Sequence, residues 1–248
     1  PCGTLFPYTT LFRSVIASGP TVADNSTYAD CESIISRYEI KDKLPKTVTN
    51  HILAGLQNQR AETPKPGDPS FASTYNFIIG SNLDALLSAE QKASGLGYNC
   101  ILLSSMINGD TREAARFHSA VGKEIIKSSH PISPPACILS GGETTVKITG
   151  NGTGGRNQEF ALAASLEISG ENPIVVLCAG TDGTDGPTDA AGAVVDNQTA
   201  KKARNMGIDP VEFLENNDSY NFFKKTGELF KTGPTNTNVM DIRVLLIK

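Results

Sequence analysis

Short apolar runs alternate with helical patterns through the middle of the chain, and this alternation limits the possible folds more than any other feature of the sequence. The apolar runs cover residues 75–79, 100–104 and 137–140, and helical patterns cover residues 82–94 and 111–127 between them. Strands that alternate with helices of about 10–15 residues are typical of βαβ units, in which neighbouring strands are parallel. The runs are almost continuously apolar, as expected where helices cover both faces of a sheet. The sequence therefore predicts an α/β fold with a parallel sheet.

The pattern changes after Gly141, which indicates a second domain. The proline-broken segment 131–136 is the expected boundary, so that residues 15–132 form the first domain and residues 136–248 the second. In the second domain we expect strands over residues 144–149, 174–179 and 243–247, and helices over residues 156–168, 199–206 and 218–223. In the first we expect a helix that is capped by Thr27 and ends near Tyr38, and another over residues 46–57.

The first 14 residues do not read as part of this fold. They lack an initial methionine, and they also lack the basic start, long apolar stretch and cleavage site of a signal peptide. They resemble a translated sequencing adaptor. We therefore assign residues 1–14 to a foreign segment and expect Val15 to mark a cut inside a longer protein.

Charge and cysteine content exclude several classes of function. The formal net charge is −4, all of it in residues 136–248, so the chain has no basic surface of the kind that binds nucleic acid. The longest apolar run is far shorter than the ~20 residues of a membrane-spanning helix, so we expect no membrane association. The five cysteines are odd in number, scattered and without metal-ligand spacing. We therefore expect a reducing compartment, the cytoplasm.

A glycine-rich segment lies between an expected strand and an expected helix. Gly150, Gly152 and Gly155 match the pattern G-x-G-x-x-G, in which backbone N–H groups and a helix N-terminus approach a phosphate. The acidic residue that would bind a ribose about 20 residues later is missing. Arg156, at the mouth of the helix, suits the charge of a phosphoryl group in transfer. The alternative is a structural turn with an exposed arginine.

Three aspartates follow the apolar run that ends at Ala179. Asp182, Asp185 and Asp189 would lie at the carboxyl edge of the sheet, where open α/β sheets bind ligands. Carboxylates with small neighbours suit Mg²⁺, which takes one or two of them together with substrate phosphates. The alternative is that each aspartate caps a helix or closes a turn.

Other polar residues follow apolar strands at the same edge, or precede the final strand. Of these, Ser81 and Asn82 have the alternative role of a helix cap, and residues 235–238 that of a polar loop. The candidates for substrate or nucleotide binding are Ser18, Gly19, Ser81, Asn82, Gly142, Glu143, Gly154, Gly155, Asn157, Thr237 and Asn238.

Several long segments, in this order and spacing, resemble the glycerate 2-kinase family with a MOFRL-type C-terminal domain: VIASGPT, ETPKPGD, IIGSN, SGGETTV, GNGTGGRNQEFAL, AGTDGTDGPTDAAGA, NDSY and TGPTNTNVMDIRVLL. The resemblance implies ATP-dependent phosphorylation of D-glycerate at its 2-hydroxyl, with Mg²⁺, giving 2-phosphoglycerate and ADP. It also implies a Rossmann-like N-terminal domain, here the partial domain 15–132, and a smaller α/β domain, here residues 136–248, with the active site between them. The family's catalytic arginine matches Arg156.

The family's catalytic lysine has no counterpart in this chain. It lies early in the N-terminal domain, before the part that matches Val15 onward, so we expect the chain to be inactive alone. Two alternatives remain open. One is an NAD(P)H-dependent hydroxypyruvate reductase, against which the missing ribose-binding acid counts. The other is a non-catalytic nucleotide-binding fragment.

Overall fold

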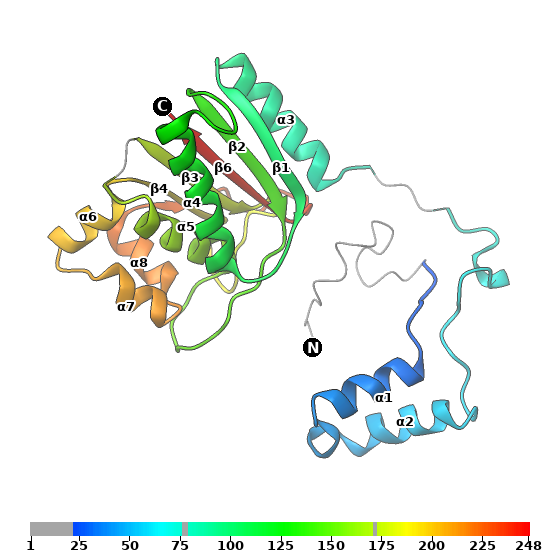
Figure 1. Cartoon of the computed structure of the whole chain (residues 1–248). Coiled ribbons are helices and arrows are strands. Elements are labelled where there is room, and N and C mark those ends of the chain that lie inside the picture. Colours follow the sequence, from blue (N-terminus) through cyan, green and yellow to red (C-terminus); the bar gives the residue numbers. More distant parts are fainter. Residues whose placement is uncertain (1–21, 76–78, 171–172) are drawn as a thin grey trace. The chain divides into compact units, whose positions relative to one another are not determined.

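The computed structural model describes residues 22–75, 79–170 and 173–248 of the chain (Figure 1). The described residues fall into two compact units, residues 22–75 and residues 79–248. The candidate residues Ser18 and Gly19 lie outside the described residues. The expected strand over residues 75–79 lies partly outside them.

The smaller unit contains a pair of helices, α1 (Tyr28–Arg37) and α2 (Lys46–Leu56), with short 3₁₀ turns at Lys41–Lys43 and Pro69–Phe71. Thr27 caps α1 as predicted: its side chain accepts a hydrogen bond from the Asp30 N–H, and the Asp30 carboxylate accepts one from the Thr27 N–H. The ring of Tyr28 packs on Gly55 of α2, where a Cβ atom would lie 2.2 Å from the ring. This close approach explains a glycine inside a helix.

The larger unit contains one six-stranded sheet in the order β1-β2-β6-β3-β4-β5. Only β1 and β2 pair in parallel, and the other neighbours are antiparallel. The parallel pairing predicted for the apolar runs 100–104 and 137–140 is confirmed by β1 and β2, whereas the described strands that follow Gly142 add antiparallel pairs. The strand at the C-terminal end of the chain inserts between β2 and β3, and apolar runs do not reveal such an insertion. The strands are β1 (Asn99–Ile107), β2 (Ala136–Gly142), β3 (Ile174–Gly180), β4 (Gly192–Asp196), β5 (Leu229–Phe230) and β6 (Asp241–Ile247).

Helices cover both faces of the sheet. On β2, Cys137 and Leu139 pack with α3, whereas Ala136 and Ile138 belong to the core formed with α4 and α5. This alternation explains why every residue of β2 is buried. The helices of this unit are α3 (Asn82–Gly95), α4 (Thr111–Ser128), α5 (Arg156–Glu167), α6 (Thr199–Asn205), α7 (Pro210–Glu215) and α8 (Ser219–Thr226).

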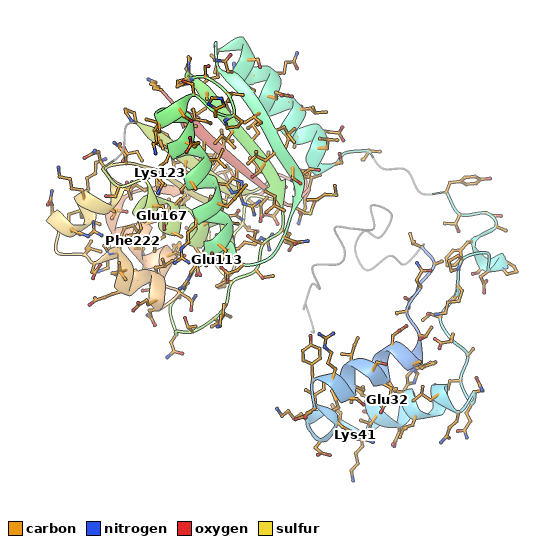
Figure 2. The ribbon with its side chains drawn as sticks, in the orientation of Figure 1. Glu32, Lys41, Glu113, Lys123, Glu167 and Phe222 are labelled. Carbon is orange, nitrogen blue, oxygen red and sulfur yellow. The ribbon has the colours of Figure 1, made fainter. Side chains whose placement is uncertain are left out.

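Helix α5 is the most deeply buried helix of the larger unit, with residues 157–165 all buried. Its C-terminal end is held by α4: Lys123 and Glu167 lie side by side in Figure 2, with Lys123 Nζ 3.4 Å from a carboxylate oxygen of Glu167. At the other end, α5 begins at Arg156, next to the edge of the sheet. The core thus fixes α5 as a rigid support for that arginine.

Most predicted helices and strands are confirmed, with two kinds of difference. Residues 144–149 form no strand, because Thr145 makes only an isolated bridge to Asp110 and has no strand beside it. Strands β4 and β5 and helix α7 were not predicted. The expected boundary at 131–136 falls between β1 and β2, which share one sheet. No helix in the described part of the chain is long and apolar enough to cross a membrane.

Candidate active site

The candidate site lies at one edge of the sheet, where β2 and β3 end and β6 begins. Strands β2 and β3 both run antiparallel to β6, so their carboxyl ends reach the same edge (Figure 1). Gly142 and Gly180 are the register partners of Asp241 on its two sides. Asp241 is fully buried, which places a carboxylate in the middle of this edge.

Arg156, the first residue of α5, is held by two carboxylates. Its Nε and Nη2 lie 2.6 and 3.0 Å from the two oxygens of Asp241, and its Nη1 lies 2.9 Å from Glu143. Burial opposes the charge of the guanidinium, but the hydrogen bonds and negative charge of Asp241, followed by the charge of Glu143, raise the pKa of Arg156 above its usual value. The Arg156 side chain is still 32% exposed. It is thus a fixed cation with one accessible side.

Asp185 caps the N-terminus of α5 from a distant loop. Gly155 at the cap position has no side chain, and the carboxylate of Asp185 accepts hydrogen bonds from the N–H groups of Asn157 and Gln158 at 3.0 and 2.9 Å. A Cβ atom on Gly155 would lie 2.3 Å from Cγ of Asp185, so only glycine fits there. Burial, together with the charge of Asp241, outweighs the opposing backbone hydrogen bonds and raises the pKa of Asp185 to about 6.

Asn157 joins the two buried carboxylates. Its Nδ2 donates to Asp185 at 3.1 Å and to Asp241 at 3.0 Å, and its Oδ1 accepts from the thiol of Cys178 at 3.0 Å. Burial is the first cause that raises the pKa of Cys178, which keeps this thiol protonated as a donor. Asn157 is therefore a buried structural link between carboxylates and lacks contact with solvent.

A second arginine lies behind Asp241. Arg243 is fully buried, with its guanidinium 5.3 Å from the ring centre of Phe160 and Nη2 3.5 Å from Asp241. Neither Asp241 nor Arg243 is among the site residues predicted from the sequence. The signal was present, because these two charged residues occupy alternate positions of an otherwise apolar strand and so share one face with buried Leu245.

The glycine-rich segment does not offer its N–H groups to a ligand over residues 149–153. The N–H groups of Thr149 and Gly150 donate to the side chain of Asn217, and that of Gly152 donates to the carbonyl of Asn216. A Cβ atom on Gly154 would lie 2.2 Å from Ser219 Oγ. Packing against residues 216–219 thus accounts for these glycines, as the structural-turn alternative predicts, and does not favour a phosphate cradle.

The three aspartates do not come together. Asp182 closes a turn on Thr184, Asp185 caps α5, and Asp189 accepts from Tyr220 at 2.9 Å and Lys231 at 2.8 Å. Among the described residues no group of three or more His, Cys, Asp or Glu side chains is arranged to hold a metal ion. The aspartates therefore do not fit a Mg²⁺ site built by the protein alone.

The remaining candidates have mixed roles. Ser81 caps α3, as one alternative predicted. Asn82 is buried and donates to the carbonyls of Val239 and Asp241 at 2.7 and 2.8 Å, which anchors the start of β6. Asn238 is exposed and donates to Asp182 at 3.2 Å, and exposed Thr237 belongs to the same loop.

Comparison with known proteins identifies the family of the chain. The MOFRL family matches residues 136–241, and a domain of unknown function (DUF4147) matches residues 13–53. Glycerate kinase of Macaca fascicularis is 35% identical, over 94% of this chain and 68% of the relative. The chain belongs to the glycerate kinase family.

Other similar proteins extend the comparison. D-glycerate 2-kinase of Thermotoga maritima is 42% identical over 94% of this chain and 53% of its own length. A protein of Agrobacterium vitis named putative hydroxypyruvate reductase is 40% identical over 94% of this chain and 52% of its length. The crystal structure of glycerate kinase from Thermotoga maritima matches this structure with a TM-score of 0.77 at 41% sequence identity. The match covers 95% of this chain and 54% of the crystallised chain, and it confirms the α/β class. The chain thus spans about half the length of these three proteins.

Proposed function

We propose that the protein containing this chain transfers the γ-phosphoryl group of ATP to the 2-hydroxyl of D-glycerate, giving 2-phosphoglycerate and ADP. The observation that carries the proposal is Arg156, a partly exposed guanidinium held between Asp241 and Glu143. Its position matches the arginine expected from the family resemblance. The substrate class comes from relatives named glycerate kinases.

Arg156 would act by charge and position. A guanidinium has five N–H groups, of which Asp241 and Glu143 engage three, so two remain for phosphoryl oxygens. In phosphoryl transfer the protein contributes mainly positioning and electrostatic stabilisation of oxygens that gain charge. Because two carboxylates fix its plane, the guanidinium needs no reorganisation when that charge develops.

We further propose that Mg²⁺ accompanies the nucleotide, because ATP is usually bound with this ion on its phosphates. The described aspartates do not fit a separate metal site, so no step is assigned to the ion.

We also propose that the protein works in a reducing compartment such as the cytoplasm. The proposal is supported by four cysteines with free thiols, Cys31, Cys100, Cys137 and Cys178.

The direct test is product formation by the protein expressed from its full open reading frame. With ATP, Mg²⁺ and D-glycerate, we expect coupled ADP release at ~1–100 s⁻¹ and 2-phosphoglycerate as the product. The 248-residue chain assayed beside it shows whether the described residues suffice. Absence of glycerate-dependent ADP release from the full reading frame would overturn the proposal.

Hydroxypyruvate reduction is the second candidate, because one relative carries that name. The same preparation is mixed with NADH and hydroxypyruvate, and oxidation of NADH is followed by absorbance. We expect none, since the N–H groups of the glycine-rich segment at Thr149, Gly150 and Gly152 are engaged within the protein. NADH oxidation without ATP turnover would replace the kinase by a reductase.

A further inference from the structure

The carboxylate of Asp241 is shared between two arginines, whose nearest contacts are both with its Oδ2. Its oxygens are 2.6 and 3.0 Å from Arg156, which reaches the surface, and one of them is 3.5 Å from Nη2 of Arg243, which does not. Asn157 adds a hydrogen bond at 3.0 Å. Asp241 therefore connects an accessible cation to a buried one.

The backbone holds Asp241 rigidly in this position. It begins β6, and β2 and β3 pair with it on both sides through Gly142 and Gly180. Its carbonyl accepts a hydrogen bond from Asn82 at 2.8 Å. A carboxylate that is fixed from three directions fixes in turn the plane of any guanidinium that it binds bidentately.

Burial of the charged Arg243 side chain in the core costs free energy. Arg243 is fully buried, and the only hydrogen bond of its guanidinium in the described structure is from Nη2 to Thr144 Oγ1 at 3.2 Å, while Nε and Nη1 have no hydrogen-bond partner there. Arginine cannot lose its proton to avoid burial of the charge. A buried cation with unpaired donors destabilises a protein, and apolar replacements of such groups are often neutral or stabilising. Stability alone therefore does not explain Arg243.

Charge balance supplies an explanation. Arg156 contacts two carboxylates, Asp241 and Glu143, so these three groups alone carry a net charge of −1, which would repel a phosphate. Arg243 adds a positive charge beside Asp241 and offsets one of the negative charges that act on Arg156, which are those of Asp241, Glu143 and Asp185. Part of the positive charge of Arg156 is thereby left for a ligand at its exposed side.

We propose that Asp241 and Arg243 are positioning residues for Arg156. Asp241 sets the plane of the Arg156 guanidinium, and Arg243 shares the charge of Asp241 so that Arg156 still attracts a phosphoryl group. This inference rests on the proposed phosphoryl transfer. It assigns a role in the reaction to two buried residues that touch no substrate.

Two substitutions separate this role from a purely structural one. In the full-reading-frame protein, Asp241→Asn should lower kcat about 10²-fold, as expected when a reacting group loses its orientation. Arg243→Met keeps side-chain length and should lower kcat about 10-fold, while thermal stability stays the same or rises. A purely structural Arg243 would instead lose stability and keep kcat per folded molecule, and that result would overturn the inference.

A double-mutant cycle tests whether Asp241 acts through Arg156. If it does, Arg156→Lys should cost less than about 3-fold in the Asp241→Asn background, although it is severe by itself. If the loss of kcat in the double variant equals the product of the losses in the two single variants, Asp241 and Arg156 act independently and the proposal is overturned. If Asp241→Asn does not fold, the cycle is run with Arg243→Met and Arg156→Lys.

A spectroscopic measurement on the 248-residue chain needs no kinase activity. The Nε–H proton of Arg156, identified by its loss in Arg156→Lys, should exchange slowly with water in NMR spectra, and Asp241→Asn should abolish that protection. The exposed aspartate Asp42 gives the control Asp42→Asn, which should change nothing. Protection that survives Asp241→Asn overturns the inference even if the kinase is active. Absent kinase activity with this protection pattern intact overturns the proposed function instead.

Discussion

At the scale of single residues, the site contains two buried carboxylates with different partners. Asp241 faces two arginines, whereas Asp185 faces backbone N–H groups at the start of α5. Backbone dipoles compensate a buried charge less completely than a full counter-ion does. Burial therefore raises the pKa of Asp185 to about 6, and its protonation falls within a readily measured pH range.

Asp185 should make the chain more stable as the pH falls from about 6 to about 4. The folded protein holds the proton of Asp185 more tightly than the unfolded chain does, so this contribution is full below the unfolded pKa of 3.8 and is lost as pH rises through about 6. Two pKa units correspond to at most about 3 kcal/mol. Urea unfolding across this pH range, compared with Asp185→Asn, should show a difference in unfolding free energy of this sign.

Asp189→Asn is the matched control, because this aspartate lies in the same loop but is exposed. Its hydrogen bonds with Lys231 and Tyr220 lower the pKa of Asp189, so its contribution is lost as the pH falls. The two variants should change the pH dependence in opposite directions. A pH profile that Asp185→Asn leaves unchanged would contradict the assignment of a raised pKa to Asp185.

At the scale of elements, the start of α5 depends on chain segments far away in sequence. Its cap comes from Asp185, its first side chain binds Asp241, and the loop before it packs against residues 216–219. Substitutions at these contacts should therefore destabilise the start of α5 and the loop before it, even where the residues of α5 itself are unchanged.

Gly155→Ala should destabilise the protein by about 1–3 kcal/mol, because the added methyl group overlaps Asp185. Displacement of Asp185 would uncap α5. Gly95→Ala, at the end of α3 with no atom within 4 Å of the new Cβ, should leave stability unchanged or raise it by up to about 1 kcal/mol. Both are measured by thermal unfolding. Equal stability of the two variants would contradict the close approach of Gly155 to Asp185.

Asn217→Asp should destabilise the loop before α5 by about 2–4 kcal/mol. The Asn217 amide donates to buried Glu159 at 3.0 Å, and a carboxylate in its place would repel Glu159. Its neighbour provides an isosteric control: Asn216→Asp keeps the oxygen that accepts from Asn151 and should cost little. Chemical denaturation compares the two, and an Asn217→Asp variant as stable as Asn216→Asp would show that this contact is unimportant.

Sequence patterns predict local elements better than their pairing. The helices 82–95 and 111–128 were predicted closely because apolar spacing is a local signal, as is the cap Ser81 of the first of them. Strand direction was not, because the position of β6 between β2 and β3 depends on contacts about 100 residues apart. Residues 144–149 alternate like a strand but have no neighbour to pair with.

The candidate site shows the same difference between local features, which the sequence predicts, and long-range contacts, which it does not. Arg156 could be predicted from its place at the start of a helix after glycines. The pairing of Arg156 with Asp241 could not, because 85 residues separate them and only the insertion of β6 brings them together. The aspartate loop was predicted as one site, yet hydrogen bonds direct Asp185 inward and Asp189 toward Lys231.

At the scale of the whole molecule, all six strands and the site belong to the unit of residues 79–248. The two main hydrophobic clusters contain only residues of this unit. A fragment of residues 79–248 should therefore unfold cooperatively. Its thermal unfolding midpoint should be close to the midpoint at which the sheet unfolds in the full chain. Circular dichroism tests this, and a fragment without a cooperative transition would show that residues 1–78 are required for folding.

In the proposed reaction Arg156, held by Asp241 and Glu143, stabilises a phosphoryl group in transfer to glycerate. The most direct measurement is kcat for glycerate-dependent ADP release by Arg156→Lys in the full-reading-frame protein. A lysine keeps the charge but cannot reproduce the planar fork, so we expect a loss of at least about 10²-fold. The control Arg204→Lys, on an exposed arginine of α6, should retain full activity. A near-normal kcat for Arg156→Lys would contradict the account.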